Sequence, residues 1–357
     1  MTAALIGSLG QALPPVRQQQ QLWDGFFAEH YQHNKVAERL FRNVGVQTRH
    51  GVVDPCVEDV SDWPTGKRMD RFVVEALPLA KEALGNALDA ARVRPEELGM
   101  LVVASCTGYA TPGLNVLLAR DMAMRPDLRS LMIGHMGCYA AIPALGAAAD
   151  YVAVHERPAL LLCLELTSLH LQPAQEVPHP VTADAVQQMV VHALFGDAAA
   201  AAVITPEHAG SAGAGLEILE VVALTDTTTS DMMTWDVTDV GFRMGLSPEV
   251  PDVLGRHVRP ATQELLARHG LGLSDVDGWV VHPGGPRILE TVGDALELSI
   301  DDVSPSRTVL SEYGNCSSAT VLMILDRVRK QVPAGGHAVM LAFGPGLTLY
   351  ATLLRVK

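Results

Sequence analysis

Three residues of this chain have side chains suited to acyl transfer, and each stands where a polar turn meets an apolar segment. Cys138 lies in GHMGCYAAIPALGAAAD, His282 directly follows the apolar residues 279–281, and Asn315 lies in SEYGNCSSAT. The small, apolar residues after Cys138 predict a buried helix whose first turn holds the thiol. Amide groups and the helix dipole stabilise a thiolate there, so we expect Cys138 to be nucleophilic, with a lowered pKa.

Each of these residues also has an ordinary structural explanation. A cysteine beside alanine and glycine is often a core residue, and a histidine after a strand is usually satisfied in the core or a loop. An asparagine before a helix is a good cap. Their positions relative to one another decide between the explanations, and those positions depend on the elements that carry the three residues.

The chain contains an internal duplication with a spacing of about 178 residues. The segment 100–109, MLVVASCTGY, is an apolar strand that ends in a turn, and 278–287, GWVVHPGGPR, has the same form. Each is followed by a small-residue helix and then by a second apolar strand, ALLLC at 159–163 and AVMLA at 338–342. Continuous apolar strands that alternate with helices predict an α/β fold whose sheets are covered on both faces.

The Gly/Ala/Ser-rich segment 205–218, TPEHAGSAGAGLEI, separates the two repeats. We therefore expect an N-terminal half, 1–208, that carries the cysteine and a C-terminal half, 209–357, that carries the histidine and the asparagine. The run AGSAGAG is interpreted as a loop rather than a phosphate cradle, because no strand-then-helix context accompanies it. His30 and His33 fit a solvated helix face better than a metal pair, and no metal site is predicted.

The duplication places the Asn315 helix start opposite the Cys138 helix start, and the His282 turn opposite the turn that contains Cys106. A pseudo-twofold arrangement would bring both helix starts and both turns to one central place. A thiol, an imidazole and an amide in that place suit acyl transfer combined with carbanion chemistry. The thiolate would carry the acyl group, while the imidazole and the amide donate hydrogen bonds to a thioester oxygen as it becomes negative.

Composition and net charge limit the kinds of ligand and the cellular setting that we expect for this protein. The 357 residues are 48% hydrophobic and 18% charged, which predicts a folded protein with a large core. A net charge of −14, with only 7 Phe, 4 Trp and 6 Tyr, argues against nucleic acid as a ligand. The start does not read as a secretory signal, and the longest apolar run, 136–149, is shorter than the roughly 20 residues of a membrane span. Five cysteines without CxxC spacing predict free thiols in a cytoplasmic protein.

Five motifs follow one another along the chain: GHMGCYA around Cys138, ALFGDAAAA at 193–201, VHPGGPRIL at 281–289, YGNCSSAT at 313–320 and FGPGLT at 343–348. On these motifs the sequence resembles the type III polyketide synthases, the chalcone-synthase-like group of the thiolase superfamily, over essentially its whole length. The resemblance implies a thiolase fold with a duplicated αβαβα layered core, and a homodimer. It also implies that acyl-CoA and malonyl-CoA are substrates and that no metal or redox cofactor is used.

The resemblance also implies roles for individual residues. Cys138 matches the acyl-accepting nucleophile, and His282 and Asn315 match the pair that stabilises the enolate formed when malonyl-CoA loses carbon dioxide. His282 further matches the ion-pair partner of the thiolate. A larger set matches positions that line the elongation cavity or its entrance: Phe195, Met233, Trp235, Met244, His170, Glu165, Cys106 and Ser317.

The chain departs from the plant members at several of these positions. Cys106 replaces the threonine of a water-orienting set that includes Glu165 and Ser317, which puts a plant-style hydrolytic cyclisation in doubt. Thr111 stands where plant enzymes project a methionine across the dimer interface, and Ala342 replaces the first glycine of a GFGPG loop.

A basic entrance for CoA is expected despite the negative net charge. Lys35, Arg39 and Arg42 recur at helical spacing in NKVAERLFRN, and Arg287 follows the HPGG turn. The alternative is an ordinary solvated helix face.

Trp235 and His170 occupy positions that affect how long a polyketide the cavity can hold. Trp235 falls where plant members carry glycine, so its indole should fill space that a growing tetraketide would use; alternatively, Trp235 turns into the core. His170 falls where plant members carry threonine. The segment GHMGCYAAIPALGAA resembles the corresponding segment of actinobacterial members that make alkylpyrones. Methionine side chains suit a tunnel for a flexible acyl chain because they adapt to its shape. We expect a fatty acyl-CoA starter, about two malonyl-CoA extensions in the reduced space, and an alkyl-α-pyrone.

Other readings stay open from the sequence. Another starter would lead to resorcinol or naphthol products. A β-ketoacyl carrier-protein synthase has the same triad and fold, although HPGG and the Phe195 motif favour the polyketide branch. If the protein were a thiol hydrolase, the HPGG and FGPGLT motifs would have no role. If it were an inactive, partner-binding homologue, the intact triad would not be expected. The starter length, the number of extensions and the mode of cyclisation are not determined by the sequence.

Overall fold

The computed structural model describes residues 2–174, 176–178, 180–209 and 215–357. Through these residues runs a nine-stranded mixed sheet in the order β11-β12-β13-β8-β1-β7-β6-β4-β5. The predicted linker 205–218 lies partly outside the described residues, since 210–214 are not among them. The division of the chain at 208/209 stays a prediction.

The two halves of the sheet have the same topology, as the duplication predicts. In each half, two strands pair in parallel and a third strand pairs antiparallel with the second of them. A fourth strand pairs antiparallel with the third and lies next to the other half. The N-terminal half contains β1 Ala4–Ala12, β4 Met100–Ala104, β5 Arg129–Ile133, β6 Ala159–Glu165 and β7 Ala198–Pro206. The C-terminal half contains β8 Leu216–Thr225, β11 Gly278–Val281, β12 His337–Gly344 and β13 Thr348–Val356.

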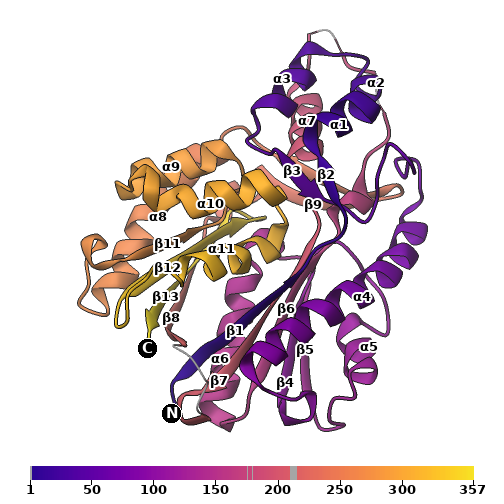
Figure 1. Ribbon diagram of the computed structural model, residues 1–357. Coiled ribbons are helices and arrows are strands. Elements are labelled where there is room, and N and C mark those ends of the chain that lie inside the picture. The colour runs from indigo at the N-terminus through magenta and orange to yellow at the C-terminus, as the bar shows by residue number, and fades with distance from the viewer. Residues whose placement is uncertain (1, 175, 179, 210–214) are drawn as a thin grey trace.

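The halves meet where β1 pairs with β8 through Leu5 and Ile6. Within the described residues β5 has no counterpart in the C-terminal half, so the N-terminal half is one strand wider. In Figure 1 the N-terminal half lies at the lower right and the C-terminal half at the left. The thiolase-type duplicated fold predicted from the sequence is confirmed.

Helices form three layers around the two half-sheets. The central layer holds α6 Ala141–His155 and α11 Thr320–Val328, and each of these helices contacts strands of both halves. One outer layer holds α4 Thr65–Ala91 and α5 Leu114–Asp121, and the other holds α8 Val250–Ala267 and α9 Pro286–Leu296. Together with α10 Ile300–Tyr313, these elements give the expected αβαβα order.

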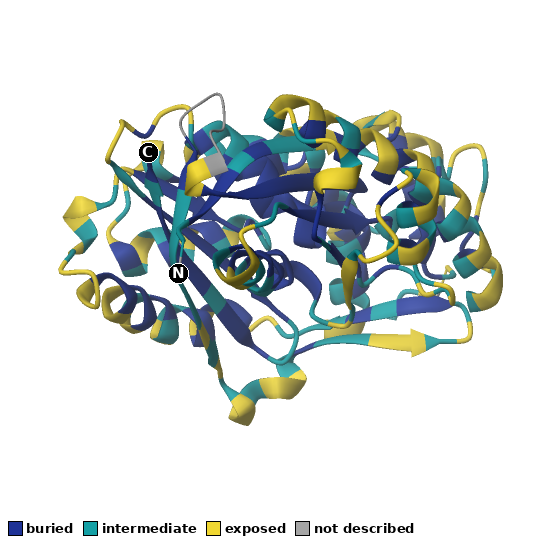
Figure 2. Ribbon diagram, turned by 90° about the horizontal axis from the view of Figure 1, so that it is seen from below, coloured by how far each residue is buried: buried dark blue, intermediate teal, exposed yellow. Residues whose placement is uncertain are grey.

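Three apolar cores separate the layers. One lies between α4 and the N-terminal half-sheet, a second surrounds the central helices, and a third lies under α8 and α9. Figure 2 shows the sheet and the central helices as buried and the outer faces as exposed. Within the described chain, Gly137–His155 is long and apolar enough to cross a membrane by composition alone. Its residues belong to the central layer, so packing against both half-sheets explains this apolar character.

A smaller group of elements covers one end of the sheet (Figure 1). It comprises β2 Val16–Gln18, α1 Gln19–Leu22, α2 Ala28–His30, α3 Lys35–Asn43, β3 Thr48–His50, α7 Ala183–Leu194, β9 Met233–Thr238 and β10 Gly241–Leu246. These elements form one wall over the ends of the strands, and the cavity described below lies beneath them.

Candidate active site

Cys138 lies at the start of the central helix, as the sequence predicts. It is in the middle of a 3-10 turn, Gly137–Tyr139, that leads into α6, and only 6% of the residue is exposed. Gly137 has a φ of +68°, and a Cβ there would lie 2.8 Å from Pro345 Cδ. A glycine is therefore required for the turn, and the FGPGLT loop packs directly against it.

Asn315 is held by the backbone between α10 and the second central helix. Its N–H donates to the carbonyl of Leu194 at 2.9 Å, and its carbonyl accepts from the N–H of Gly196 at 3.0 Å. The side-chain Oδ1 accepts from the N–H of Ser317 at 2.9 Å. Because only the amide oxygen can accept that bond, the NH₂ group is left as a donor, and a side-chain hydrogen bond from Asn315 stabilises the thiolate form of Cys138. The residue is thus both a turn cap and a fixed donor.

His282 follows β11 and is anchored by its backbone, with its N–H on the carbonyl of Leu341 at 2.9 Å. It is 1% exposed, and neither Nδ1 nor Nε2 has a hydrogen-bond partner in the described part of the chain. Burial lowers the pKa of His282 to about 3. The interpretation of this histidine as a satisfied core residue therefore fails, because satisfied buried imidazoles have partners.

The protonation of Cys138 differs from the prediction. Burial raises the pKa of the Cys138 thiol to about 12; Ser317 and Asn315 oppose this rise and the charge of Glu165 adds to it. No hydrogen bond joins Cys138 to His282 among the described residues. The predicted lowering of the pKa by the helix start is wrong for the thiol on its own, since the loss of water around a buried thiolate outweighs the helix amides.

Glu165, Cys106 and Ser317 lie beside the thiol in one hydrogen-bonded cluster. Glu165 is fully buried at the end of β6 and accepts from Ser318 Oγ at 2.6 Å, Thr107 Oγ1 at 2.8 Å and the Cys106 N–H at 3.0 Å. The Cys106 Sγ lies 3.5 Å from the Glu165 carboxylate and 3.8 Å from Ser317 Oγ. The structure therefore brings together the three residues of the expected water-orienting set.

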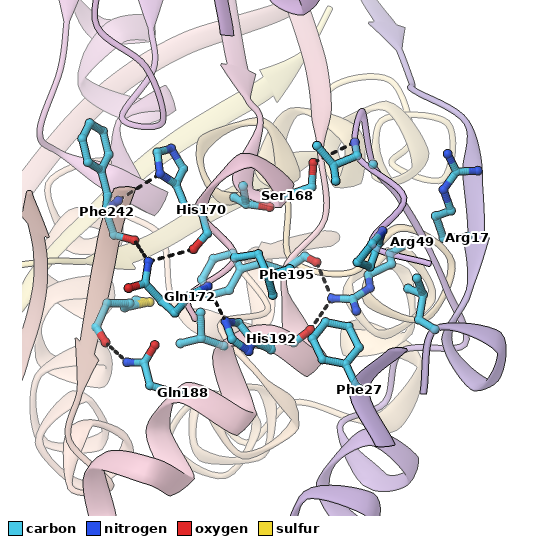
Figure 3. A pocket seen from close by; sticks show the side chains of 18 of the residues that line it. Arg17, Phe27, Arg49, Ser168, His170, Gln172, Gln188, His192, Phe195 and Phe242 are labelled. Atoms are coloured by element: carbon cyan, nitrogen blue, oxygen red, sulfur yellow. Dashed lines mark hydrogen bonds between the residues drawn. The ribbon is translucent and has the colours of Figure 1, made fainter. Parts of the chain in front are cut away.

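A cavity lies beneath the covering elements (Figure 3), and Trp235 in its wall connects it to this cluster through a hydrogen bond to the Cys106 carbonyl. Four of the predicted cavity residues line it: Phe195, Trp235, Met244 and His170. Glu165, Cys106 and Ser317 are not among its lining residues, and neither are the three catalytic residues. Its other walls are largely apolar and include Leu22, Phe27, Val53, Leu171, Val191 and Phe242. Met233 does not line it; its side chain packs with Val250 and Leu347 in a cluster that also contains Met244. The placement of Met233 in the cavity is therefore wrong, although Met233 and Trp235, two residues apart, lie on the same face of the strand.

Trp235 forms part of the cavity wall. On the β9–β10 hairpin it pairs across the strands with Met244. Its Nε1–H donates to the carbonyl of Cys106 at 2.8 Å, and its ring meets the His170 ring edge-to-face at 5.5 Å. The indole thus stands between the cavity and the Cys106 turn, which excludes the alternative in which it turns into the core.

His170 lines the cavity but has no ring nitrogen left for a ligand. Its Nε2 lies 2.7 Å from the Thr107 carbonyl and its Nδ1 accepts from the N–H of Phe242 at 3.0 Å. This pattern fixes the neutral tautomer with the proton on Nε2. Burial lowers the pKa of His170 to about 4, so its contribution to the cavity is the face of a neutral ring.

Comparison with known proteins decides between the readings that the sequence left open. The N-terminal domain of chalcone and stilbene synthases matches residues 2–208, and the C-terminal domain of the same family matches residues 222–357. The chain belongs to the chalcone and stilbene synthase family. It is accordingly a type III polyketide synthase, an acyltransferase that uses CoA thioesters, and neither a carrier-protein synthase nor a thiol hydrolase.

Individual relatives cover nearly the whole chain. A 1,3,6,8-tetrahydroxynaphthalene synthase of Streptomyces peucetius is 35% identical over 98% of this chain and 92% of its own. The Mycobacterium tuberculosis protein Pks18, named for α-pyrone synthesis, is 32% identical over 89% of this chain and 81% of its own. The crystal structure of the Streptomyces coelicolor tetrahydroxynaphthalene synthase superposes with a TM-score of 0.89 at 29% identity and 99% coverage of both chains.

The four basic residues expected at the CoA entrance of this synthase differ in whether an acidic side chain pairs with them. Lys35 and Arg42 both pair with Glu38, each at 2.8 Å, so their charges are partly neutralised. Arg39 and Arg287 are exposed, and neither has an acidic partner in the described chain. The two lie on neighbouring elements, because a Cβ on Gly45, just after α3, would lie 3.4 Å from Pro286 Cγ at the start of α9.

Sequence reasoning missed several residues of the cavity, most of them on or near α7. Gln188, Val191 and His192 line it together with the predicted Phe195. Their spacing of three and four residues marks one helix face, so the Phe195 motif could have been extended backwards to find them. Arg49, which donates to the Phe195 carbonyl at 2.9 Å, is a buried cation that no sequence pattern singled out. No group of three metal-ligating side chains is found within the described residues.

Proposed function

We propose that this type III polyketide synthase condenses a fatty acyl-CoA starter with malonyl-CoA by decarboxylative Claisen condensation and then releases an alkyl-α-pyrone. The observation that carries the proposal is the largely apolar cavity beside the Cys106–Glu165–Ser317 cluster, because a flexible hydrocarbon chain is the ligand that such walls favour. The relative named for α-pyrone synthesis supports the same product class.

Cys138 carries the acyl group in this proposal. The thiolate attacks the carbonyl of the starter thioester, the carbon–sulfur bond to CoA breaks, and CoA leaves as a thiol after taking up a proton. Burial opposes a lone thiolate and also a lone imidazolium, so the thiol proton passes to His282 only where the two charges form together as a pair. The ring nitrogens of His282 have no other partner among the described residues. The resulting pair of opposite charges is better tolerated in a buried site than either charge alone.

His282 and Asn315 serve the extension step. Malonyl-CoA loses carbon dioxide, and the electron pair of the broken carbon–carbon bond becomes an enolate whose oxygen accepts hydrogen bonds from the imidazole and from the Asn315 NH₂ group. The enolate carbon then attacks the acyl group on Cys138, and the thiolate leaves. The NH₂ group suits this role because its orientation is fixed before the charge develops.

Trp235 limits the length of the polyketide. Its indole is held by the Cys106 carbonyl and by the His170 ring, so it cannot move aside without the loss of a hydrogen bond. Few extension units, about two, fit beside it. The enol oxygen on the δ-carbon of a short chain then attacks the thioester carbonyl, the carbon–sulfur bond breaks, and the thiol leaves with the enol proton as the lactone forms.

A naphthol is the second candidate product, because the tetrahydroxynaphthalene synthase of Streptomyces peucetius is 35% identical to this chain. A resorcinol would require a third extension and an aldol closure. A panel of acyl-CoA starters with malonyl-CoA, analysed by mass spectrometry, distinguishes the products. Preference for a malonyl or aromatic starter would overturn the fatty acyl proposal.

The Trp235→Gly variant tests the limit on length. We expect tetraketide pyrones or resorcinols in place of part of the triketide pyrone, because removal of the indole enlarges the cavity next to the Cys106 turn. Phe242→Leu is a suitable control, because it trims the cavity on the other face of the His170 ring, at 4.5 Å. An unchanged product profile in Trp235→Gly would show that the indole does not limit extension.

We also propose a homodimer located in the cytoplasm. The edge strand β5 is exposed along most of its length and carries Leu131 and Met132, each 38% exposed. Tyr109 and Val116 add exposed apolar surface on neighbouring elements. Such an edge is normally protected, and a second copy of the chain would do so. All five cysteines are free, as expected in a reducing compartment.

A further inference from the structure

The wall of the cavity nearest to α7 separates it from a second pocket. Gln172, Gln188 and His192 line both spaces. The second pocket lies between α7 and the segment around His30 and Tyr31. Figure 3 shows the three shared side chains at the lower side of the cavity, below Phe195 and His170.

Two of the three shared residues are anchored by protein groups. His192 Nδ1 lies 2.6 Å from Tyr31 Oη, and its Nε2 accepts from the N–H of Gln172 at 3.2 Å. Gln172 Nε2 donates to the carbonyls of His170 and Phe242, each at 3.0 Å. Both nitrogens of His192 and the amide nitrogen of Gln172 are therefore occupied, and a ligand gains nothing from them.

Gln188 differs from its neighbours because its oxygen is buried and also lacks a partner among the described residues. The residue is 9% exposed, and its Nε2 donates to the carbonyl of Met244 at 2.9 Å. Only an N–H can donate to a carbonyl, so the amide orientation is fixed and Oε1 lies on the opposite side. This oxygen is buried and makes no hydrogen bond with the described residues.

The remaining buried polar atom of the cavity wall without a hydrogen bond, among the described residues, is Arg17 Nε, and it lies 3.5 Å from the Asp54 carboxylate. Gln188 Oε1 is therefore the buried unsatisfied acceptor of the wall among the described residues. A buried acceptor without a donor is costly, whereas the same acceptor with a donor contributes favourably. A plain hydrocarbon chain would cover this oxygen without satisfying it.

We propose that Gln188 Oε1 accepts a hydrogen bond from a hydroxyl group of the acyl substrate held in the cavity, so that Gln188 is a specificity-determining residue. The inference rests on the proposed function, because the cavity is taken as the acyl site. The O–H group has two possible sources, a hydroxyl on the starter chain or an enol of the extended polyketide. A site that hydrogen-bonds a hydroxyl discriminates strongly against the analogue that lacks it.

Gln19 is a matched control. It is 5% exposed, its Nε2 donates to the Ala193 carbonyl at 2.7 Å, and its Oε1 also lacks a partner in the described chain. It lines neither pocket. Gln19→Met therefore removes a similar amide from the same helix neighbourhood without changing the cavity wall.

Binding is measured first, by calorimetry on the Cys138→Ala background, with a saturated acyl-CoA and its hydroxylated counterparts of equal length. For a hydroxyl on the starter, we expect one hydroxylated chain to bind about tenfold tighter than the saturated chain. Gln188→Met should abolish the difference, and Gln19→Met should retain it. Gln188→Glu should restore it, because burial keeps that carboxyl protonated, able to donate to Met244 and to accept from the ligand.

Turnover of the variants with Cys138 intact tests the second source. For an enol, Gln188→Met should change the ratio of products that differ in extension number, with every starter, while starter binding shows no preference for a hydroxyl. If Gln188→Met matches Gln19→Met in both binding preference and product ratio, the inference is wrong. Failure of the proposed function is a separate outcome, since the wild-type enzyme would then make no polyketide from any fatty acyl-CoA.

Discussion

Asn315 shows how one side chain serves structure and chemistry through different atoms. Its oxygen caps the turn through the Ser317 N–H at 2.9 Å, and its NH₂ group is left as a donor. Asn315→Asp keeps the acceptor and removes the donor, whereas Asn315→Ala removes both. We expect both variants to lose malonyl-CoA decarboxylation by about 100- to 1000-fold, the usual cost of one oxyanion donor.

Acyl transfer to Cys138 should be retained in these two variants, with a smaller loss than decarboxylation, because Asn315 is only one of the groups that stabilise the thiolate of Cys138. Carbon dioxide release from malonyl-CoA and mass spectrometry of the acylated enzyme measure the two steps separately. Normal decarboxylation in Asn315→Asp would show that the residue is only a cap.

The pH dependence of Cys138 alkylation tests whether His282 takes up the proton of the thiol. Burial raises the pKa of Cys138 to about 12 when the thiol is considered alone, so an isolated thiol would be protonated at neutral pH. Below its pKa the thiolate fraction rises about tenfold per pH unit. We therefore expect His282→Ala to react with iodoacetamide only as the pH rises above 8, whereas the wild type reacts near neutral pH because the imidazole takes the proton.

Peptide mapping distinguishes Cys138 from the exposed Cys56, which is labelled in both proteins. Loss of turnover in Cys138→Ala confirms that the labelled thiol is the acyl carrier. Identical pH profiles for the wild type and His282→Ala would exclude proton transfer between the two residues.

At the scale of elements, α3 and the start of α9 form the proposed CoA entrance. Glu38 neutralises Lys35 and Arg42, which leaves Arg39 as the cation of α3 that is available to a phosphate. Arg39→Glu should raise the KM for acyl-CoA by roughly tenfold, because a charge-assisted hydrogen bond is lost and a repulsion is gained.

The KM for an N-acetylcysteamine thioester, which lacks the nucleotide, should change little in Arg39→Glu. Arg92→Glu provides a control for the change in net charge, because Arg92 is exposed at the end of α4, outside the entrance. An equal rise in KM for both kinds of thioester would argue against a phosphate contact.

At the scale of the whole molecule, the edge strand β5 would expose unpaired backbone groups and apolar side chains to water if the protein were a monomer. The double variant Leu131→Glu/Met132→Glu should shift the protein from dimer to monomer in light scattering, because four like charges would face one another across a twofold contact. Ile300→Glu is the control, since Ile300 is 80% exposed at the start of α10 and far from β5 in the sheet order. A wild-type monomer would overturn the proposed dimer.

Much of the molecule could be predicted from the sequence because it depends on local patterns. The duplicated order of apolar strands and small-residue helices predicted both half-sheets, and the helix starts predicted where Cys138 and Asn315 lie. These features follow from side-chain periodicity and from turn residues such as Gly137, whose φ of +68° admits few other residues.

The tertiary structure decided the properties that depend on distant neighbours. The pKa of Cys138 is set by burial and by Glu165, which is 27 positions away in the chain, and the local helix start predicted the wrong direction. Met233 and Trp235 share a face of one short strand in the pattern, yet only the indole reaches the cavity, because the hairpin's packing on Val250 takes up Met233. The spacing on α7 could have placed Gln188 in the cavity wall, but not its unsatisfied oxygen, which exists only once the surrounding chain has folded around it and removed the water.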